Sequence, residues 1–208
     1  MIILFLDVDG VLNNRPTFKK LADSGKHTTE ALDDECIGRL KKLVDTFGAT
    51  GVKIVLSSSW RFSPDHVLLL TRKLKEFGLK IEDQTTKKGS HRGTQIAEWL
   101  EKNKPRFTEH RKILILDDDS DMLPEQMPFF VKTNMDTGLT DEHVAKAIEI
   151  IQAIPTQTPK FKRTIWTEEE FRAVCFCKPC SKQTLHVGTH ETEDGHWVHK
   201  CVECNTFD

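Results

Sequence analysis

Two aspartates two positions apart follow an apolar segment near the N-terminus. Residues 2–6 read Ile-Ile-Leu-Phe-Leu, and Asp7-Val8-Asp9-Gly10 comes directly after them. Side chains two apart in an extended chain point to the same side, so the carboxylates of Asp7 and Asp9 should lie close together. Carboxylates this close share a proton or bind a cation. A carboxylate in such a position can also act as a nucleophile toward a phosphate ester.

Two further polar clusters follow apolar segments of the same kind. Ser57-Ser58-Ser59 follows Val52–Leu56, and a cluster of four aspartates and a serine, residues 117–121, follows Ile113–Leu116. Active sites of open α/β folds lie at the carboxyl ends of the strands, so we expect these clusters at one site. Each cluster alone could be a helix cap. The three together, with a basic segment at residues 87–93 between them, indicate an active site.

The chemistry expected of these residues is phosphoryl transfer. Asp7 would attack phosphorus, while Asp9 would protonate the leaving oxygen and then activate water. Asp7 and Asp117 would supply the carboxylate oxygens that Mg²⁺ prefers. Ser57 would donate to a phosphoryl oxygen, and Arg92 would neutralise charge on the phosphoryl group. The alternative for Ser57 is a helix cap, and for Arg92 a solvated helix start.

The elements that must position these residues alternate between strand and helix. Strands are expected at residues 2–6, 52–56, 79–81, 113–116 and 129–131, and helices from Asp33, from Ser63, after Gly93 and from Thr140. This alternation predicts an α/β fold, a Rossmann-like three-layer sandwich with a mainly parallel five-stranded sheet. Residues 13–31 are polar and irregular, and we expect a loop or flap there.

The motifs resemble those of the haloacid dehalogenase (HAD) superfamily of aspartate-nucleophile phosphatases. The segment Asp7-Val8-Asp9-Gly10-Val11-Leu12-Asn13 resembles the first motif and Val55-Leu56-Ser57 the second. Arg92 is our choice for the basic residue of the third motif, with Lys88 as the alternative. Asp117-Asp118 followed by Asp121 resembles the fourth. The resemblance covers residues 1–154.

This resemblance implies a Mg²⁺-dependent phosphomonoesterase that forms an aspartyl-phosphate. The implied Mg²⁺ ligands are Asp7, Asp9, Asp117, Asp118 and Asp121, with Asp9 contributing its backbone carbonyl. The triple serine leaves the register of the second motif open, so that Ser58 could replace Ser57. The side chains expected to contact substrate are Ser58, Arg61 and Lys88, and the alternative for Arg61 is a solvated surface arginine.

Three shorter segments resemble a branch of the superfamily found in RNA-repair proteins. They are Ser-Ser-Trp-Arg at 58–61, Arg92-Gly93, and Thr137-Gly138-Leu139-Thr140. The 3′-phosphatase domain of phage polynucleotide kinases is similar, which implies nucleic-acid ends or nucleotides as substrates. The motif spacing leaves no room for a large cap, and an open site admits large substrates. The alternatives are a small-molecule phosphatase outside nucleic-acid metabolism, and a binding protein with a vestigial phosphatase fold.

The C-terminal part contains two Cys-x-x-Cys pairs. Cys177/Cys180 and Cys201/Cys204 have 20 residues between the pairs, which is typical of a zinc ribbon with a structural Zn²⁺. Free or redox-active thiols are the alternative. We expect a linker at residues 155–164, then a short helix and the ribbon at 165–208, with a hairpin between the pairs and Cys175 as a spare thiol.

Composition sets limits on the partners and the compartment. The chain has 208 residues, 30% of them charged, and a net charge of −2. A contact with a polyanion must therefore be local. No apolar segment reaches the roughly 18 residues of a membrane span. Six cysteines without an export signal favour a reducing compartment, so we expect a cytoplasmic protein.

Overall fold

The computed structural model describes residues 1–25, 31–86, 91–103 and 112–153 in full, and the backbone of three strands in the C-terminal part. The chain divides into two compact units, residues 1–159 and 160–208. The elements of the first unit, two 3₁₀-helices (η) included, are β1 (Ile2–Leu6), α1 (Arg15–Asp23), α2 (Asp34–Thr46), β2 (Val52–Leu56), η2 (Ser59–Phe62), α3 (Pro64–Glu76), β3 (Ile81–Gln84), α4 (Arg92–Lys102), β4 (Lys112–Asp117), η4 (Pro124–Phe129), β5 (Phe130–Lys132) and α5 (Asp141–Ala153).

The sheet of the first unit has five parallel strands in the order β3-β2-β1-β4-β5. Strand β1 lies at the centre, and all five of its residues are buried. A central strand that is covered on both faces consists of consecutive apolar residues, which explains the sequence of this segment. The predicted five-stranded parallel sheet is confirmed.

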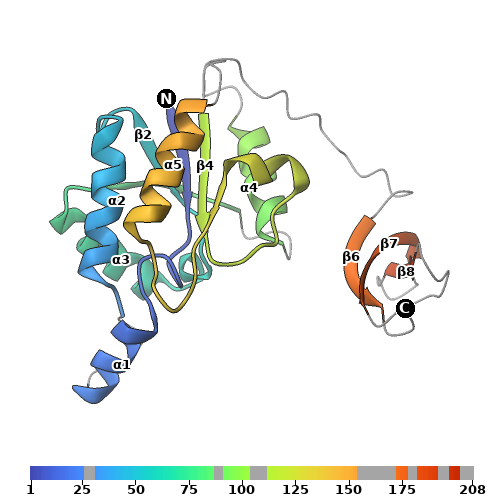
Figure 1. Ribbon diagram of the computed structural model, residues 1–208, viewed down its shortest axis with the longest axis horizontal. Helices are drawn as coiled ribbons and strands as arrows, with labels where there is room; N and C mark the ends of the chain where they lie inside the picture. The colour runs from blue at the N-terminus through green and yellow to red at the C-terminus, as the bar shows by residue number, and fades with distance from the viewer. Residues whose placement is uncertain are drawn as a thin grey trace. The chain divides into compact units, whose positions relative to one another are not determined.

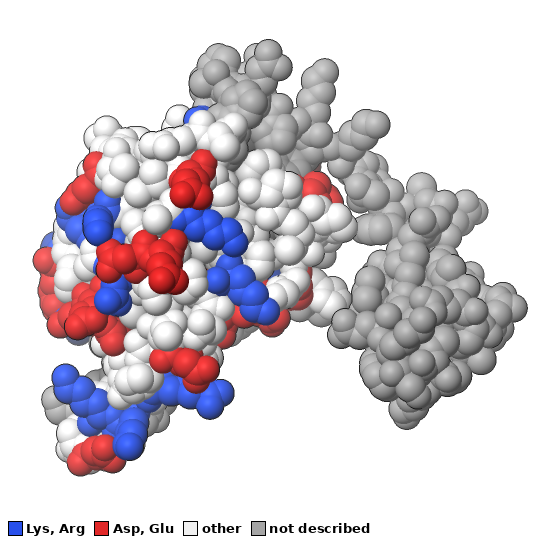
Figure 2. All heavy atoms as spheres, in the orientation of Figure 1, with Lys and Arg blue, Asp and Glu red and all other residues white. Residues whose placement is uncertain are grey.

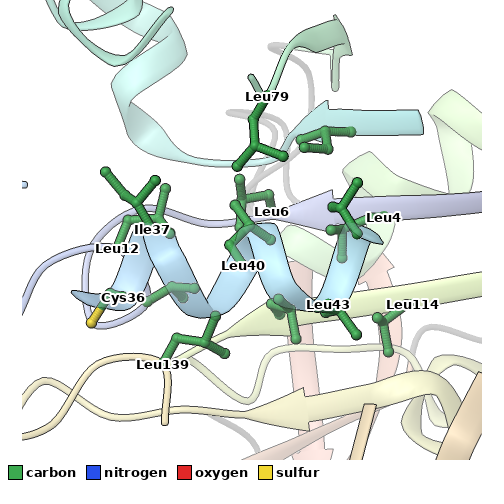
Figure 3. Close-up of a cluster of buried hydrophobic side chains, with 14 of the residues drawn as sticks. Leu4, Leu6, Leu12, Cys36, Ile37, Leu40, Leu43, Leu79, Leu114 and Leu139 are labelled. Carbon is green, nitrogen blue, oxygen red and sulfur yellow. The ribbon is translucent and has the colours of Figure 1, made fainter. Parts of the chain in front are cut away.

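Helices cover both faces of this sheet (Figure 1). Helices α2, α3 and α5 share one apolar cluster with alternate residues of the strands, among them Leu4 and Leu6 of β1 (Figure 3). On the opposite face Phe5 meets Trp99 of α4, with ring centroids 5.4 Å apart and the rings nearly perpendicular. The alternation of β1 side chains between two helical layers gives the three-layer sandwich expected from the sequence.

Strand β3 begins two residues later than the sequence predicted. The reason is the way in which α3 ends. Gly78 has a φ of +69°, and the amide of Leu79 donates to the carbonyl of Leu74 at 2.9 Å. This is the Schellman arrangement, in which an apolar residue after the glycine packs back on the helix. Leu79 therefore belongs to the end of α3, and β3 starts only at Ile81.

The loop or flap predicted at residues 13–31 contains a helix, α1, which the sequence analysis missed. Asn14 caps it by accepting a hydrogen bond from the amide of Thr17, and Pro16 lies in its first turn. Both are recognised helix-start signals. None of its residues is fully buried, and α1 projects from the sandwich (Figure 1). The helix has only nine residues, with Phe18 and Leu21 as its large apolar side chains, which is why the pattern did not reveal it.

Acidic and basic side chains are interspersed on the face of the first unit seen in Figure 2. This agrees with the small net charge of −2 for the chain. In the part of the chain that the structure describes, no helix has the length and hydrophobicity needed to cross a membrane.

The second unit contains three antiparallel strands in the order β6-β7-β8: β6 (Arg172–Cys177), β7 (Lys182–Glu191) and β8 (Trp197–Cys201). The predicted hairpin corresponds to β7 and β8. The outer strands both run opposite to β7 and end at Cys177 and Cys201, paired with Lys182 and His186 respectively. Along β7, Cys201 therefore lies four positions from Cys177, because its partner His186 is four residues beyond Lys182. Cys180, Cys204, the linker and the short helix predicted after Thr167 lie outside the described residues.

Leu40 of α2 provides a test of the packing of this helix on the sheet. It is 0% exposed, whereas Leu68 of α3 is 49% exposed. We expect Leu40→Ala to lower the free energy of unfolding by about 2–5 kcal/mol because it leaves a cavity, and Leu68→Ala to change it by less than about 0.5 kcal/mol. Urea unfolding followed by circular dichroism measures both. Equal unfolding midpoints for the two variants would contradict this packing.

Candidate active site

The carboxyl ends of neighbouring strands bring the predicted residues to one edge of the sheet. The amide of Asp7 donates to Leu116 of β4 at 2.9 Å, and the amide of Ser57 donates to Leu6 of β1 at 2.8 Å. Hydrogen bonding between the strands thus extends to the first residues of two of the polar clusters, and Asp117 ends β4. Asp7, Ser57 and Asp117 therefore lie at neighbouring strand ends, as predicted from the sequence.

Three carboxylates form one group at this edge. Oxygen atoms of Asp7, Asp117 and Asp118 all lie within 4.8 Å of one another. Asp7 is 4% exposed and Asp117 is 1% exposed. Carboxylate oxygens gathered in this way are the ligands that Mg²⁺ takes in proteins. The donor atoms present therefore fit a hard divalent cation.

Gly10 allows this group to form. Its φ is +66°, a left-handed conformation that favours glycine. A Cβ atom at this position would lie 2.5 Å from Oδ2 of Asp118. The chain therefore turns sharply after β1 at a position where only glycine leaves room for the Asp118 carboxylate.

Burial opposes ionisation of these carboxyl groups. It raises the pKa of Asp7 well above its usual range, and the nearby Asp117 raises it further. Burial also raises the pKa of Asp117 to about 6, although the positive charge of Arg92 acts in the opposite direction. The pKa of Asp118 is raised as well, first by burial and then by other carboxylates. Carboxylates that are ionised despite this burial favour a bound cation, because its positive charge offsets their negative charge.

Arg92, the first residue of α4, supplies positive charge to two members of the group. Its Nη2 atom lies 3.2 Å from Oδ1 of Asp7, and its Nε atom lies 2.9 Å from Oδ2 of Asp117. The second contact is an ion pair without the alignment of a hydrogen bond. Of the two candidates for the basic position, Arg92 thus reaches Asp7. Lys88 lies outside the described residues.

Asp121 holds the start of α4 in place. Its Oδ2 accepts from the amide of Arg92 at 2.7 Å, and its carbonyl accepts from the amide of Gly93 at 3.1 Å. The Gln126 side chain donates to the carbonyl of Gly93 at 2.8 Å. A Cβ atom at Gly93 would lie 2.5 Å from the Leu123 amide nitrogen, so this close approach requires glycine. Asp121 thus caps α4, outside the group of three carboxylates.

The carboxylate of Asp9 also lies outside that group. Asn13 donates to its Oδ1 at 2.8 Å. The indole nitrogen of Trp60 donates to Oδ1 at 3.2 Å and to Oδ2 at 3.1 Å. The two aspartates of the first motif therefore have different surroundings, since Asp7 lies among charged groups and Asp9 among neutral donors.

The two serines after β2 differ in their contacts. The side chain of Ser58 interacts with Asp7 and lowers the pKa of that carboxyl group, and its Oγ accepts from the amide of Trp60 at 3.3 Å. Ser57 Oγ is buried and has no hydrogen-bond partner among the described residues. Ser58 is thus the serine in contact with Asp7.

Arg61 is a buried arginine beside the site. It donates to the carbonyls of Ser58 and Thr86 and to Oε1 of Gln95. Burial lowers its pKa to about 10, and the charge of Arg92 contributes to the shift. These partners are neutral oxygens, so the guanidinium keeps its positive charge close to Asp7 and Arg92.

The roles of several residues that shape the site were missed by the sequence analysis. Trp60 and Asn13 hold Asp9, Gln95 holds Arg61, and Gln126 holds α4. Gln95 had a readable signal, because it lies on the same helical face as Ile96 and Trp99, where a polar residue is unusual. No sequence signal links Trp60 to Asp9, since 51 positions separate them.

A comparison with protein families agrees with the motifs and the geometry. The model of a family described as the HAD domain in Swiss Army Knife RNA repair proteins matches residues 3–144, more than half of the 208 residues. No curated protein and no solved structure matched the chain. The resemblance to the HAD superfamily is confirmed, and the matched segment runs from β1 into α5. The chain therefore belongs to the family of HAD domains found in Swiss Army Knife RNA repair proteins.

Proposed function

We propose that the protein is a Mg²⁺-dependent phosphomonoesterase that forms an aspartyl-phosphate on Asp7. The observation that supports this most strongly is the environment of Asp7 at the end of β1. It lies within 4.8 Å of two other carboxylates and 3.2 Å from the guanidinium of Arg92. A nucleophile among negative groups needs positive charge to remain ionised and to approach a phosphate, and Arg92 supplies it.

In the proposed mechanism each residue has a distinct task. Asp7 attacks phosphorus, and Asp9 gives a proton to the leaving oxygen. Asp9 then takes a proton from the water that hydrolyses the aspartyl-phosphate. Arg92 binds the phosphoryl oxygens, as does Ser57 or Ser58. Arg61 and Lys88 are proposed to contact the remainder of the substrate.

The Mg²⁺ site is proposed at the group of three carboxylates. Asp7, Asp117 and Asp118 would hold the ion. The main-chain carbonyl of Asp9 and Oδ1 of Asp121, which has no hydrogen-bond partner among the described residues, would be further ligands. When bound, Mg²⁺ would neutralise the charge of the phosphoryl group and of the carboxylates around it.

We propose nucleic-acid ends carrying a 3′-phosphate, or nucleotides, as the substrates. The RNA-repair setting of the family supports this choice. Between β1 and α2 the described part of the chain contains only the short helix α1, so a large cap is absent there. The catalytic positions of the motifs are filled, which argues against a vestigial fold that serves only binding.

Asp7→Asn should lower kcat at least about 1,000-fold, because an amide of the same size cannot act as the nucleophile. Phosphate release would be measured from an aryl phosphate, a set of nucleotides and a 3′-phosphorylated oligonucleotide, each with Mg²⁺ or EDTA. Asp45→Asn makes the same change at a surface ion pair and should leave the rate unchanged.

The outcomes of this assay separate the alternatives. Absence of Mg²⁺-dependent turnover on every substrate would overturn the phosphatase proposal. Turnover of small phosphate esters alone would favour a small-molecule phosphatase. Wild-type rates in Asp7→Asn would refute the assignment of the nucleophile.

Thermal unfolding should show a Mg²⁺ effect that depends on pH. The folded protein raises the pKa of Asp117 from 3.8 to about 6, so it keeps a proton that the unfolded chain loses. Stability from this group therefore falls as pH rises between these values. Millimolar Mg²⁺ competes with that proton, and we expect it to raise Tm more at about pH 7.5 than at about pH 5. Equal shifts at both pH values, or an undiminished shift in Asp117→Asn, would contradict the site.

For the C-terminal unit we propose a structural Zn²⁺ bound by Cys177, Cys180, Cys201 and Cys204. The 20 residues between the two Cys-x-x-Cys pairs support this, because that spacing is typical of a zinc ribbon. Four thiolates close the coordination shell of Zn²⁺, so the ion would stabilise structure.

Elemental analysis of the purified chain should find about one zinc per molecule. Cys177→Ser should lose most of this zinc because it removes a ligand. Cys175→Ser changes the same kind of side chain in the same strand and should retain it. Zinc absent from the wild type, or retained equally by both variants, would contradict the proposed site.

A further inference from the structure

Trp60 connects the end of β2 to the proposed acid/base residue on the end of β1. Its indole nitrogen lies 3.2 Å from Oδ1 and 3.1 Å from Oδ2 of Asp9. The N–H group is thus shared between the two oxygens. The contact joins positions 51 residues apart, so it depends on the pairing of β1 with β2.

The second donor to Asp9 comes from its own turn. Asn13 donates through Nδ2 to Oδ1 of Asp9 at 2.8 Å and accepts at its own Oδ1 from the amide of Gly10 at 2.9 Å. Among the described residues, Oδ1 of Asp9 therefore has two donors, whereas Oδ2 has the shared indole alone. Oδ2 is the oxygen with more capacity left to carry a proton.

Trp60 is itself held firmly. It is 6% exposed, its amide donates to Ser58 Oγ at 3.3 Å, and its ring packs against His66 with centroids 4.8 Å apart. Ser58 in turn contacts Asp7. A short 3₁₀-helix thus links the proposed nucleophile and the proposed acid/base residue to one rigid support.

We infer that Trp60 is a positioning residue that orients Asp9 for proton transfer. This inference rests on the proposed phosphatase function. In the first step the Asp7 carboxylate forms a bond to phosphorus, the bond from phosphorus to the leaving oxygen breaks, and the proton on Oδ2 of Asp9 moves to that oxygen. In the second step water bonds to phosphorus, its proton returns to Oδ2, and the Asp7–phosphorus bond breaks.

The indole N–H can donate a hydrogen bond to either protonation state of Asp9 without moving. The indole shares its N–H between the two oxygens of the ionised carboxylate, and it keeps Oδ1 as an acceptor when Oδ2 carries the proton. Without this donor the carboxyl group can rotate about its bond to Cβ. Loss of orientation should therefore impair the transfer of the proton more than the attack by Asp7.

The test varies the leaving group of the substrate in the full-length protein. A dinitrophenyl phosphate releases a weakly basic oxygen that needs little protonation, whereas a nucleoside 3′-monophosphate releases an alkoxide that needs it fully. We expect Trp60→Phe to lower kcat/KM about 10- to 100-fold for the nucleotide and less than about threefold for the dinitrophenyl ester. The quantity kcat/KM reports the step in which the leaving group departs.

Trp99→Phe is a matched control. Trp99 is also buried, at 3% exposed, and its indole nitrogen also donates to a carboxylate, Oδ2 of Asp83 at 3.1 Å. The same substitution there should change kcat/KM for both substrates by the same factor. A loss of stability common to the two variants is thus separated from a loss of proton transfer.

The result that overturns the inference is an equal effect of Trp60→Phe on both substrates, or no effect on either, in an active wild-type enzyme. If Trp60→Phe does not fold, site-specific incorporation of benzothienylalanine at position 60 replaces the N–H with sulfur and keeps the two rings. It should give the same selective loss. A wild type inactive on both substrates would instead overturn the proposed function, and this inference with it.

Discussion

The confinement of Asp7 and Asp117 side by side at the buried ends of β1 and β4 is the constraint on which the rest of the site depends. Burial raises the pKa of both groups, so their charges require compensation. The protein provides it through Arg92, which contacts both carboxylates. The position of α4 then follows, because its first residue must reach between two strand ends.

Much of the local structure maintains this arrangement. The turn at Gly10 leaves room for Asp118, and the close approach at Gly93 lets Asp121 and Gln126 hold the start of α4. The helices on the other face contribute the apolar cluster that holds β1 at the centre of the sheet (Figure 3). The burial of apolar side chains thus stabilises a fold that also buries charged groups, which by itself costs free energy.

The two aspartates of the first motif show how one turn can produce two kinds of carboxylate. Asp7 lies among carboxylates and a guanidinium, where burial raises its pKa and the neighbouring charges shift it further. Asp9 lies among the neutral donors Asn13 and Trp60. Separate surroundings for adjacent carboxyl groups are what a nucleophile and a proton carrier require.

The sequence by itself determined the parallel α/β sheet and the strand ends at which the acidic residues lie, because apolar runs and polar clusters are local patterns. It did not reveal α1, a helix of nine residues with few large apolar side chains, or the late start of β3, where Leu79 completes the end of α3. Only the tertiary structure decided which serine contacts Asp7, that Asp121 caps α4, and that Trp60 reaches Asp9. These contacts join side chains from different elements, so they depend on directions in space that spacing along the chain does not encode.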